Sequence, residues 1–411
     1  MKKQVFFVLT ALLLILSGCA SDEVQIEKNL NSDEPVCGLR SVDEAVTLAK
    51  SMAAARGKAS RSGGAVEVAN VAAIGSKASR SGADTLLYAV NFADDAGYTL
   101  VSAAKYGEAV LGYTDKGSFD VEKAQTNPNF SYYLEAAKDY VSDNLVNGGV
   151  IIDPSTPVTT SEKIYPRIMV EYGQEYPEGE LFENGYAGCT QTATAMIFSF
   201  VGEPKSITYT CPDIDMDSEV LDWATLKLHT KSIKPVLINS ITNHDKNCSA
   251  SSETHAVLSR LCREIGYRNK AQIESSKLTT ANFTMSYLNI YNILYGHCTT
   301  YQYNPAEGTF YDALAAQNCV IWISGRTSED AEIRDGYVWL CDGGGKQTIT
   351  SKAQLANGEW ETRVEYKYYN HFNWGDCGND NGYFLSGVFT KKDGFTTKDY
   401  KYNITYFIIK K

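Results

Sequence analysis

The spacing of apolar residues predicts a small mixed module in the first part of the chain. Residues 43–55 follow a helical pattern, whereas residues 86–120 alternate as β-strands do. We expect helices at 43–55 and 130–146 and strands at 87–92, 98–102 and 109–113. The turn Asp94–Gly97 between the first two strands is typical of a hairpin. Residues 56–84 are rich in glycine, serine, alanine and arginine, which predicts an exposed loop.

The second part of the chain places helices before strands, which indicates the α+β class. Residues 190–200 carry an apolar stripe at helical spacing, and a second stripe predicts a helix that ends at Gly266. The other expected elements are a helix at 306–317 and strands at 319–324, 337–342, 364–373, 383–385 and 404–409. A proline-containing linker at 151–162 separates a module at 38–150 from a larger domain at 163–411.

The N-terminus has the pattern of an export signal. Lys2 and Lys3 precede an apolar run that is too short for an ordinary membrane span. The run ends in small residues before Cys19, which resembles a bacterial lipoprotein box. Residues 20–23 resemble the surface-export tags of Bacteroidetes lipoproteins. We therefore expect residues 1–18 to be a signal peptide, a lipid on Cys19 that anchors the chain in an envelope membrane, and a tether at 19–37. The alternative is a plain secretory signal with an incidental cysteine.

Composition narrows the classes of function. The formal net charge is -11, which argues against a nucleic-acid partner because phosphate binding needs a basic face. The chain has 10 cysteines, and an exported protein can form disulfides, but the sequence assigns no pairing. It contains neither Cys-x-x-Cys nor His-Glu-x-x-His. We expect no metal and no cofactor.

Cys189 is the strongest candidate for chemistry. It lies between Gly188 and Thr190 at the start of a predicted helix. Free N–H groups at a helix N-terminus favour a thiolate and can also donate to an oxyanion. This position suits a nucleophile, but a small buried residue at a helix start would give the same pattern. The position alone leaves both interpretations open.

Neighbouring motifs resemble those of the streptopain family of papain-like cysteine peptidases. Residues 188–197 read Gly-Cys-Thr-Gln-Thr-Ala-Thr-Ala-Met-Ile and are similar to the family pattern Gly-Cys-x-x-Thr-Ala-x-Ala-x-Ile. Upstream, the segment ending at Gln174 is similar to Trp-x-Gln, and downstream residues 373–375 match Asn-Trp-Gly. Residues 88–120 resemble the family's inhibitory prodomain. The resemblance implies a papain-like fold at 163–411, preceded by a prodomain at 38–150 that covers the cleft.

The resemblance also implies a role for each matched residue. Cys189 becomes the nucleophile and Gln174 completes the oxyanion hole. Asn373 orients the catalytic imidazole, and Trp374 shields that contact. The family's histidine motif is Gly-His-Ala-(aromatic)-x-x-Asp-Gly, and this chain has Tyr337 at the histidine position. A tyrosine carries no positive charge, so it cannot stabilise a thiolate as imidazolium does. We expect weak or absent catalysis, with Tyr337 near the thiol.

Two other interpretations stay open. His371 lies two residues before Asn373 and shares its strand face, so it is a candidate for a relocated base in an active endopeptidase. The third interpretation is a non-catalytic surface protein that binds peptides or glycans. In all three, the expected partners are protein or peptide substrates or ligands and the chain's own prodomain.

Overall fold

The computed structural model describes most of the chain after residue 37. The described residues are 38–57, 66–75, 85–147, 158–175, 177–227, 252–276, 290–300, 302–303, 305–326, 337–354, 360–389 and 403–411. The signal peptide, the tether and Cys19 lie outside them. No helix in these ranges is both long and apolar enough to cross a membrane.

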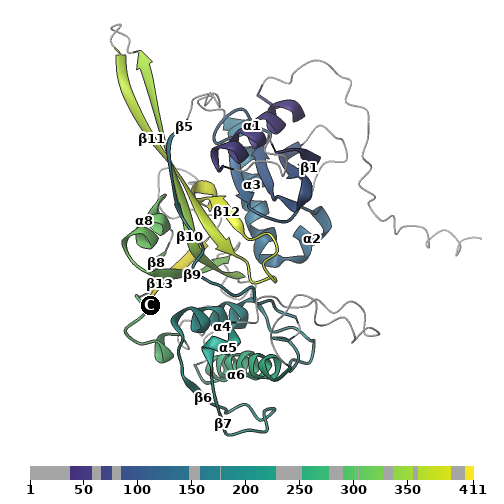
Figure 1. The fold of residues 1–411 in the computed structure, drawn as a ribbon, viewed down its shortest axis with the longest axis vertical. Helices are drawn as coiled ribbons and strands as arrows, with labels where there is room; N and C mark the ends of the chain where they lie inside the picture. The colour runs from purple at the N-terminus through teal and green to yellow at the C-terminus, as the bar shows by residue number, and fades with distance from the viewer. Residues whose placement is uncertain are drawn as a thin grey trace, which may run out of the picture. The chain divides into compact units, whose positions relative to one another are not determined.

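The described part of the first module consists of three α-helices, one short 3-10 helix and an antiparallel sheet (Figure 1). Its elements are α1 (Val42–Ala55), β1 (Val68–Gly75), β2 (Thr85–Phe92), the short helix η1 (Ala93–Asp95), β3 (Tyr98–Ser102), β4 (Val110–Thr114), α2 (Val121–Thr126) and α3 (Pro128–Asn147). Ser41 and Glu44 form a reciprocal capping box at the start of α1. The predicted helices and strands are confirmed. The predicted loop at 56–84 is wrong in part, because β1 pairs with β2 along its length.

The second domain begins with β5 (Val158–Ile164), so residues 158–162 of the expected linker belong to a strand that pairs with β10. The helical elements that follow are α4 (Cys189–Val201), α5 (Trp223–Leu226), α6 (Ser252–Ser276), α8 (Thr309–Ala316) and η3 (Ser386–Phe389). The strands are β6 (Ser206–Thr208), β7 (Ser218–Val220), β8 (Gln302–Tyr303), β9 (Cys319–Arg326), β10 (Tyr337–Gln354), β11 (Trp360–Asn373), β12 (Gly382–Leu385) and β13 (Asn403–Lys410). β10 and β11 form a long hairpin, visible in Figure 1.

Gly266 does not end its helix as expected, because α6 continues to Ser276. A Cβ at Gly266 would lie 3.0 Å from the ring of Phe182 and 3.3 Å from the side chain of Gln191. Glycine at this position allows α6 to approach the chain that leads into α4. Close packing outweighs the weak helix propensity of glycine here.

The sheets of the module and the domain are joined by hydrogen bonds between β4 and β12. Along the large sheet the order is β1-β2-β3-β4-β12-β11-β10-β9-β13-β8. Gly382 pairs with Thr114, and a Cβ on it would lie only 2.5 Å from the Tyr113 carbonyl oxygen, so glycine permits the approach. The largest hydrophobic cluster contains side chains of both parts, whereas a second cluster surrounds α4 and α6. The module and the domain therefore share one core.

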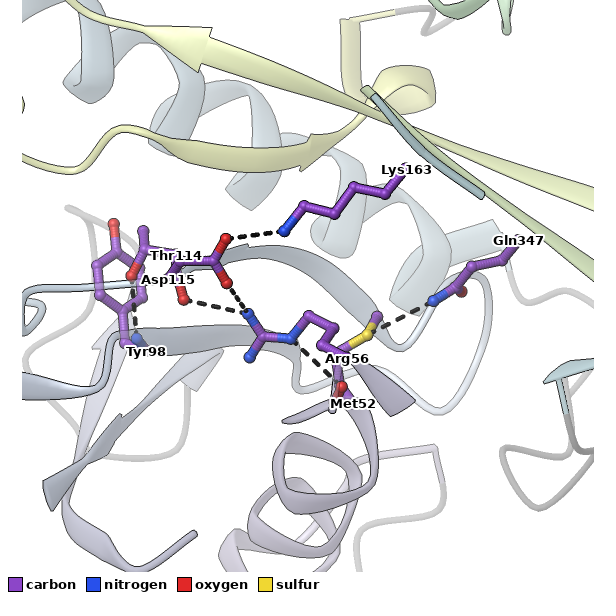
Figure 2. A network of polar contacts seen from close by, with 7 residues as sticks. All are labelled: Met52, Arg56, Tyr98, Thr114, Asp115, Lys163 and Gln347. Carbon is purple, nitrogen blue, oxygen red and sulfur yellow. Dashed lines mark hydrogen bonds and ion pairs between the residues drawn. The ribbon is translucent and has the colours of Figure 1, made fainter. Parts of the chain in front are cut away.

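A polar network also links the module to β5 (Figure 2). The Asp115 carboxylate accepts from Arg56 at 3.1 Å and from Lys163 of β5 at 3.0 Å. Arg56 lies over the ring of Tyr113 at 4.1 Å, and burial lowers the pKa of its guanidinium. Nearby, the Gln347 amide contacts the sulfur of Met52 at 3.6 Å. These contacts hold the first strand after the linker against the module.

Candidate active site

Cys189 is the first residue of α4. The preceding residue, Gly188, has φ 90 and caps the helix without a side-chain hydrogen bond. A side chain at this φ would be strained, so the glycine permits the abrupt entry into the helix. The first turn of α4 therefore starts at the thiol, and its N–H groups point toward that end. The structure confirms the predicted helix at this residue.

The groups around the Cys189 thiol shift its pKa in opposite directions. Burial raises the pKa of the Cys189 thiol, although part of the residue remains exposed. Hydrogen bonds from the Val338 amide and from Thr190 lower that pKa without reversing the shift. The strongest influences on the thiol thus come from burial, amides and a hydroxyl. A charged imidazole is not among them.

Gln174 is held beside the start of α4 by two hydrogen bonds. Its backbone carbonyl accepts from the Ala187 amide at 2.6 Å, and the carbonyl of Gly173 accepts from the Thr192 hydroxyl at 2.9 Å. The Gln174 side chain is buried. The structure therefore brings the predicted oxyanion residue to the segment that carries the predicted nucleophile. The role of the Gln174 side-chain amide as an oxyanion donor stays a prediction.

Asn373 and Trp374 lie at the end of β11. Asn373 pairs with Leu340 of β10, and its side-chain oxygen accepts from the Gly375 amide at 3.2 Å. The indole of Trp374 is fully buried and donates to the carbonyl of Asp380 at 2.9 Å. A Cβ on Gly375 would lie 3.3 Å from the Thr192 methyl group, so this loop packs against α4.

Tyr337 and Val338 begin β10 and belong to different hydrophobic clusters. Val338 packs in the cluster that Cys189 borders, whereas Tyr337 packs against the cluster shared with the module. The ring of Tyr337 lies 5.0 Å from the ring of Tyr132 on α3. At this point of β10, the backbone amide of Val338 lowers the pKa of the Cys189 thiol. A hydrogen bond between Tyr337 and Asn373 stays a prediction.

His371 forms a buried pair with Asp342. Its Nδ1 lies 2.6 Å from a carboxylate oxygen of Asp342, whose other oxygen accepts from the Ile168 amide at 3.0 Å. His371 pairs with Gly343, farther along β10 than Val338. At the usual strand rise, Gly343 lies roughly 15 Å along β10 from Val338. This separation weighs against His371 as the base for Cys189.

Two contacts from the module reach this region, and sequence reasoning missed both. Asn129 at the start of α3 donates through its Nδ2 to the Val338 carbonyl at 2.8 Å and to the Trp374 carbonyl at 2.7 Å. The hydroxyl of Tyr98 donates to Asp380 at 2.9 Å, and burial raises the pKa of that carboxyl to about 6. Asn129 and Asp380 stand in no recognisable motif, so only the fold identifies them.

Tyr172, two residues before Gln174, and the loop after residues 373–375 also lie here. Tyr172 is buried and donates to the Leu226 carbonyl at 3.0 Å. Cys377 has φ 56, and its amide donates to the Tyr172 carbonyl at 3.3 Å. Burial, together with the nearby Asp376 and Glu175, raises the pKa of Tyr186 to about 12. The Cys377 amide therefore ties the loop after Gly375 to the segment that carries Gln174.

The described residues contain no group of three or more His, Cys, Asp or Glu side chains placed to hold a metal ion. All seven described cysteines are free thiols. The chemistry that this arrangement can support is therefore attack by a thiol next to a helix N-terminus, with amide donors for an oxyanion.

Comparisons with known proteins agree with this geometry. Residues 169–384, more than half of the chain, match the model of the Peptidase C10 family. Residues 41–141 match the model described as Spi protease inhibitor. The search of curated proteins found no match.

Two solved structures from Prevotella intermedia are similar to this chain. One is a mutant fragment of prointerpain A, with 14% identity and a TM-score of 0.47; the match covers 82% of this chain and 98% of that one. The other is the active interpain A cysteine protease, with 16% identity and a TM-score of 0.34; the match covers 62% and 97%, respectively. The family matches and the motif-bearing segments around α4 and β11 lead to one conclusion: this chain belongs to the Peptidase C10, or streptopain, family and carries a Spi-type inhibitory prodomain ahead of a papain-like α+β domain.

Proposed function

We propose that this protein is a streptopain-family homologue whose Cys189 is positioned as a nucleophile but is not activated. The observation that carries the proposal is the surroundings of the thiol. Burial raises its pKa, and amides, not an imidazolium, provide the opposing influence. A neutral thiol is a poor nucleophile near neutral pH. Peptidase activity is therefore weak or absent.

The missing base accounts for most of the expected loss. In a thiol peptidase the imidazole stabilises the thiolate and later protonates the leaving amine. Tyr337 occupies the family's histidine position in the sequence and can provide neither function at neutral pH. Without the base, roughly 10³-fold catalysis over water can still come from the oxyanion donors and from binding. We infer that residual cleavage is slow.

The prodomain contributes a second barrier. Asn129 bridges the backbone of β10 at Val338 and the backbone at Trp374, directly beside the candidate nucleophile and Asn373. A peptide that pairs with the Val338 or Trp374 carbonyl must displace this amide. Its buried Oδ1 has no hydrogen-bond partner, which makes the contact less favourable than a fully bonded one. The full-length chain is therefore latent for ligand binding as well as for cleavage.

A working endopeptidase with His371 as the base is the alternative. It requires His371 to leave Asp342 and to reach the Cys189 thiol. A non-catalytic protein that binds peptides or acts as a decoy is the second alternative, and it fits the intact cleft scaffold. Weak catalysis and peptide binding are compatible with each other.

Cleavage of casein tests the proposal. The full-length chain and a chain cut in the 148–157 segment should both cleave at background rates, and Cys189→Ala should not lower them. Robust cleavage that Cys189→Ala abolishes would contradict the proposal. If His371→Ala abolishes the same cleavage and Cys189 is still required, the relocated-base alternative is correct.

We also propose that the chain is exported and anchored by a lipid on Cys19. The support is the basic start, the apolar run and the small residues before Cys19. Cys19→Ser should move the protein from membrane to soluble fractions. Equal membrane association of the variant and the wild type would contradict the anchor.

A further inference from the structure

A pocket of about 230 Å³ lies at the C-terminal end of α4. Ser199 and Phe200 form its wall on that helix, and Met169 and Lys227 also line it. Cys189 is at the opposite end of the same helix, so roughly 15–20 Å of helix separates the two places. The pocket is therefore distinct from the candidate active site.

The charged side chains among the described lining residues of this pocket are all cationic. They belong to Arg167, Lys227 and Lys411, and none of the described lining residues is an aspartate or glutamate. Lys227 makes no ion pair with any carboxylate of the described residues. Burial lowers the pKa of the Lys227 ammonium, and the nearby charges of Lys411 and Lys205 lower it further. These cations repel one another at a position where water is partly excluded.

The three cationic side chains differ in their contacts. The Arg167 guanidinium donates to the carbonyls of Leu314, Gln317 and Cys319, at 2.6 to 2.8 Å, so it forms a fixed positive wall. The Lys411 ammonium lies 5.4 Å from the Phe200 ring centroid. Lys227 has no such partner among the described side chains and keeps its donors available.

The negative end of the α4 dipole explains only part of this cluster. Lys205 donates to the Gly202 carbonyl at 2.7 Å and so caps the last turn of the helix. Lys227 is not bonded to a helix carbonyl through its side chain. Lys227 is partly buried and lies near two other cations, so an anion in the pocket would reduce the repulsion among them.

We propose that this pocket binds an oxyanion of the size of a phosphoryl group, through Lys227 and Lys411 against the fixed charge of Arg167. The volume exceeds what one phosphoryl group needs, so a larger molecule can carry it. Met169, which is 73% exposed, adds an apolar side chain at the pocket. This chemistry fits a soluble phosphate ester or a phospholipid headgroup.

Calorimetry with inorganic phosphate is the first test, on the full chain with Cys19→Ser so that no lipid anchor interferes. Phosphate should bind the chain, and Lys227→Gln should weaken binding about tenfold because one charged hydrogen bond is lost. Lys411→Gln should also weaken it. Lys50→Gln is the matched control, since Lys50 is exposed on α1, and it should leave binding unchanged. Raising the salt to about 1 M should weaken binding in the wild type.

Cosedimentation with vesicles identifies the source of the phosphoryl group. Binding to phosphatidylglycerol vesicles but not to phosphatidylcholine vesicles, lost in Lys227→Gln, supports the proposal with a lipid headgroup as ligand. Phosphate binding without vesicle binding supports it with a soluble ester. Binding of neither probe, or equal binding by Lys227→Gln and Lys50→Gln, overturns the proposal. Circular dichroism of each variant establishes that the fold is retained.

Discussion

Two polar sites lie along β10, one at Cys189 and one at the pair of His371 and Asp342. They differ in the group that contacts the thiol or the imidazole. At the start of β10, the Val338 amide lowers the pKa of the Cys189 thiol, whereas the adjacent Tyr337 ring packs against Tyr132. Farther along, Asp342 holds His371 in a buried pair. A histidine–carboxylate pair needs only two neighbouring strands. A thiol–imidazole pair needs an imidazole beside the start of α4, and we propose that Tyr337 takes the sequence position of that histidine.

The largest expected effect comes from placing a histidine at the start of β10. Tyr337→His should raise the alkylation rate of Cys189 at about pH 6.5 by tenfold or more, because an imidazolium stabilises the thiolate. The chain should first be cut in the 148–157 segment and the prodomain removed, since Tyr132 holds the residue 337 side chain on its own face. Mass spectrometry of the labelled peptide measures the rate.

Tyr337→Phe is the matched control, because it removes the hydroxyl without adding a base. It should label at the wild-type rate. Equal acceleration by both substitutions would mean that loss of the hydroxyl, and not gain of an imidazole, activates the thiol.

Substitutions in the pair of His371 and Asp342 should change the free energy of unfolding but not the reactivity of the Cys189 thiol. His371→Ala removes one partner of a buried pair and should lower the free energy of unfolding by about 3 kcal/mol. His371→Gln, which can still donate a hydrogen bond to Asp342, should cost less. Urea unfolding measures both. A change in the Cys189 labelling rate in folded His371→Ala would connect two sites that the structure keeps apart.

Asp380, which accepts a hydrogen bond from Tyr98 of the module, should make the stability of the protein depend on pH. Burial raises the pKa of its carboxyl to about 6, above the ordinary value of about 4. The folded state therefore holds this proton more tightly, and the group's contribution to stability declines as pH rises from about 4 to about 6. Asp380→Asn removes that decline and can still accept from Tyr98.

Thermal unfolding of wild type and Asp380→Asn should therefore diverge with pH. The variant should be more stable by about 2 kcal/mol at about pH 7.5 and should approach the wild type near pH 4. A variant that is less stable than wild type at about pH 7.5 would show that the carboxylate strengthens the contact with Tyr98.

The smallest expected effect concerns the contacts of β5. Asp115→Asn keeps the shape of the side chain but removes the charge that faces Arg56 and Lys163. The Asp115 side chain is 42% exposed, so solvent screens these pairs and the loss should be at most about 1 kcal/mol. The difference from wild type should shrink at high salt. A larger, salt-independent loss would mean that Asp115 acts through packing.

Local patterns predicted most elements and the placement of Cys189, because helix periodicity and strand alternation are encoded over short stretches. They failed where distant segments decide the structure. Helix α6 continues through Gly266, where close packing of Phe182 favours glycine. Strand β1 forms because it pairs with β2. Asn129 reaches the site only because α3 packs against β10 and the end of β11. Such contacts leave no trace in the local sequence.

The packing of the Tyr337 side chain was likewise not predictable from the local sequence. The motif identified the residue at the histidine position, but it did not indicate that the module would offer Tyr132 as a packing partner. The sequence likewise did not show whether His371, two residues before Asn373, acts as a catalytic base or pairs with Asp342. The structure shows the pair with Asp342.

The pH dependence of Cys189 alkylation tests the central claim most directly. Iodoacetamide labelling of the wild-type chain, with the prodomain removed, should rise as one step with a midpoint above about pH 8.5, the ordinary range for a thiol. The labelling rate should be near zero at about pH 6. A plateau of rapid labelling from about pH 5 to pH 7 would reveal a preformed thiolate and would contradict an unactivated nucleophile.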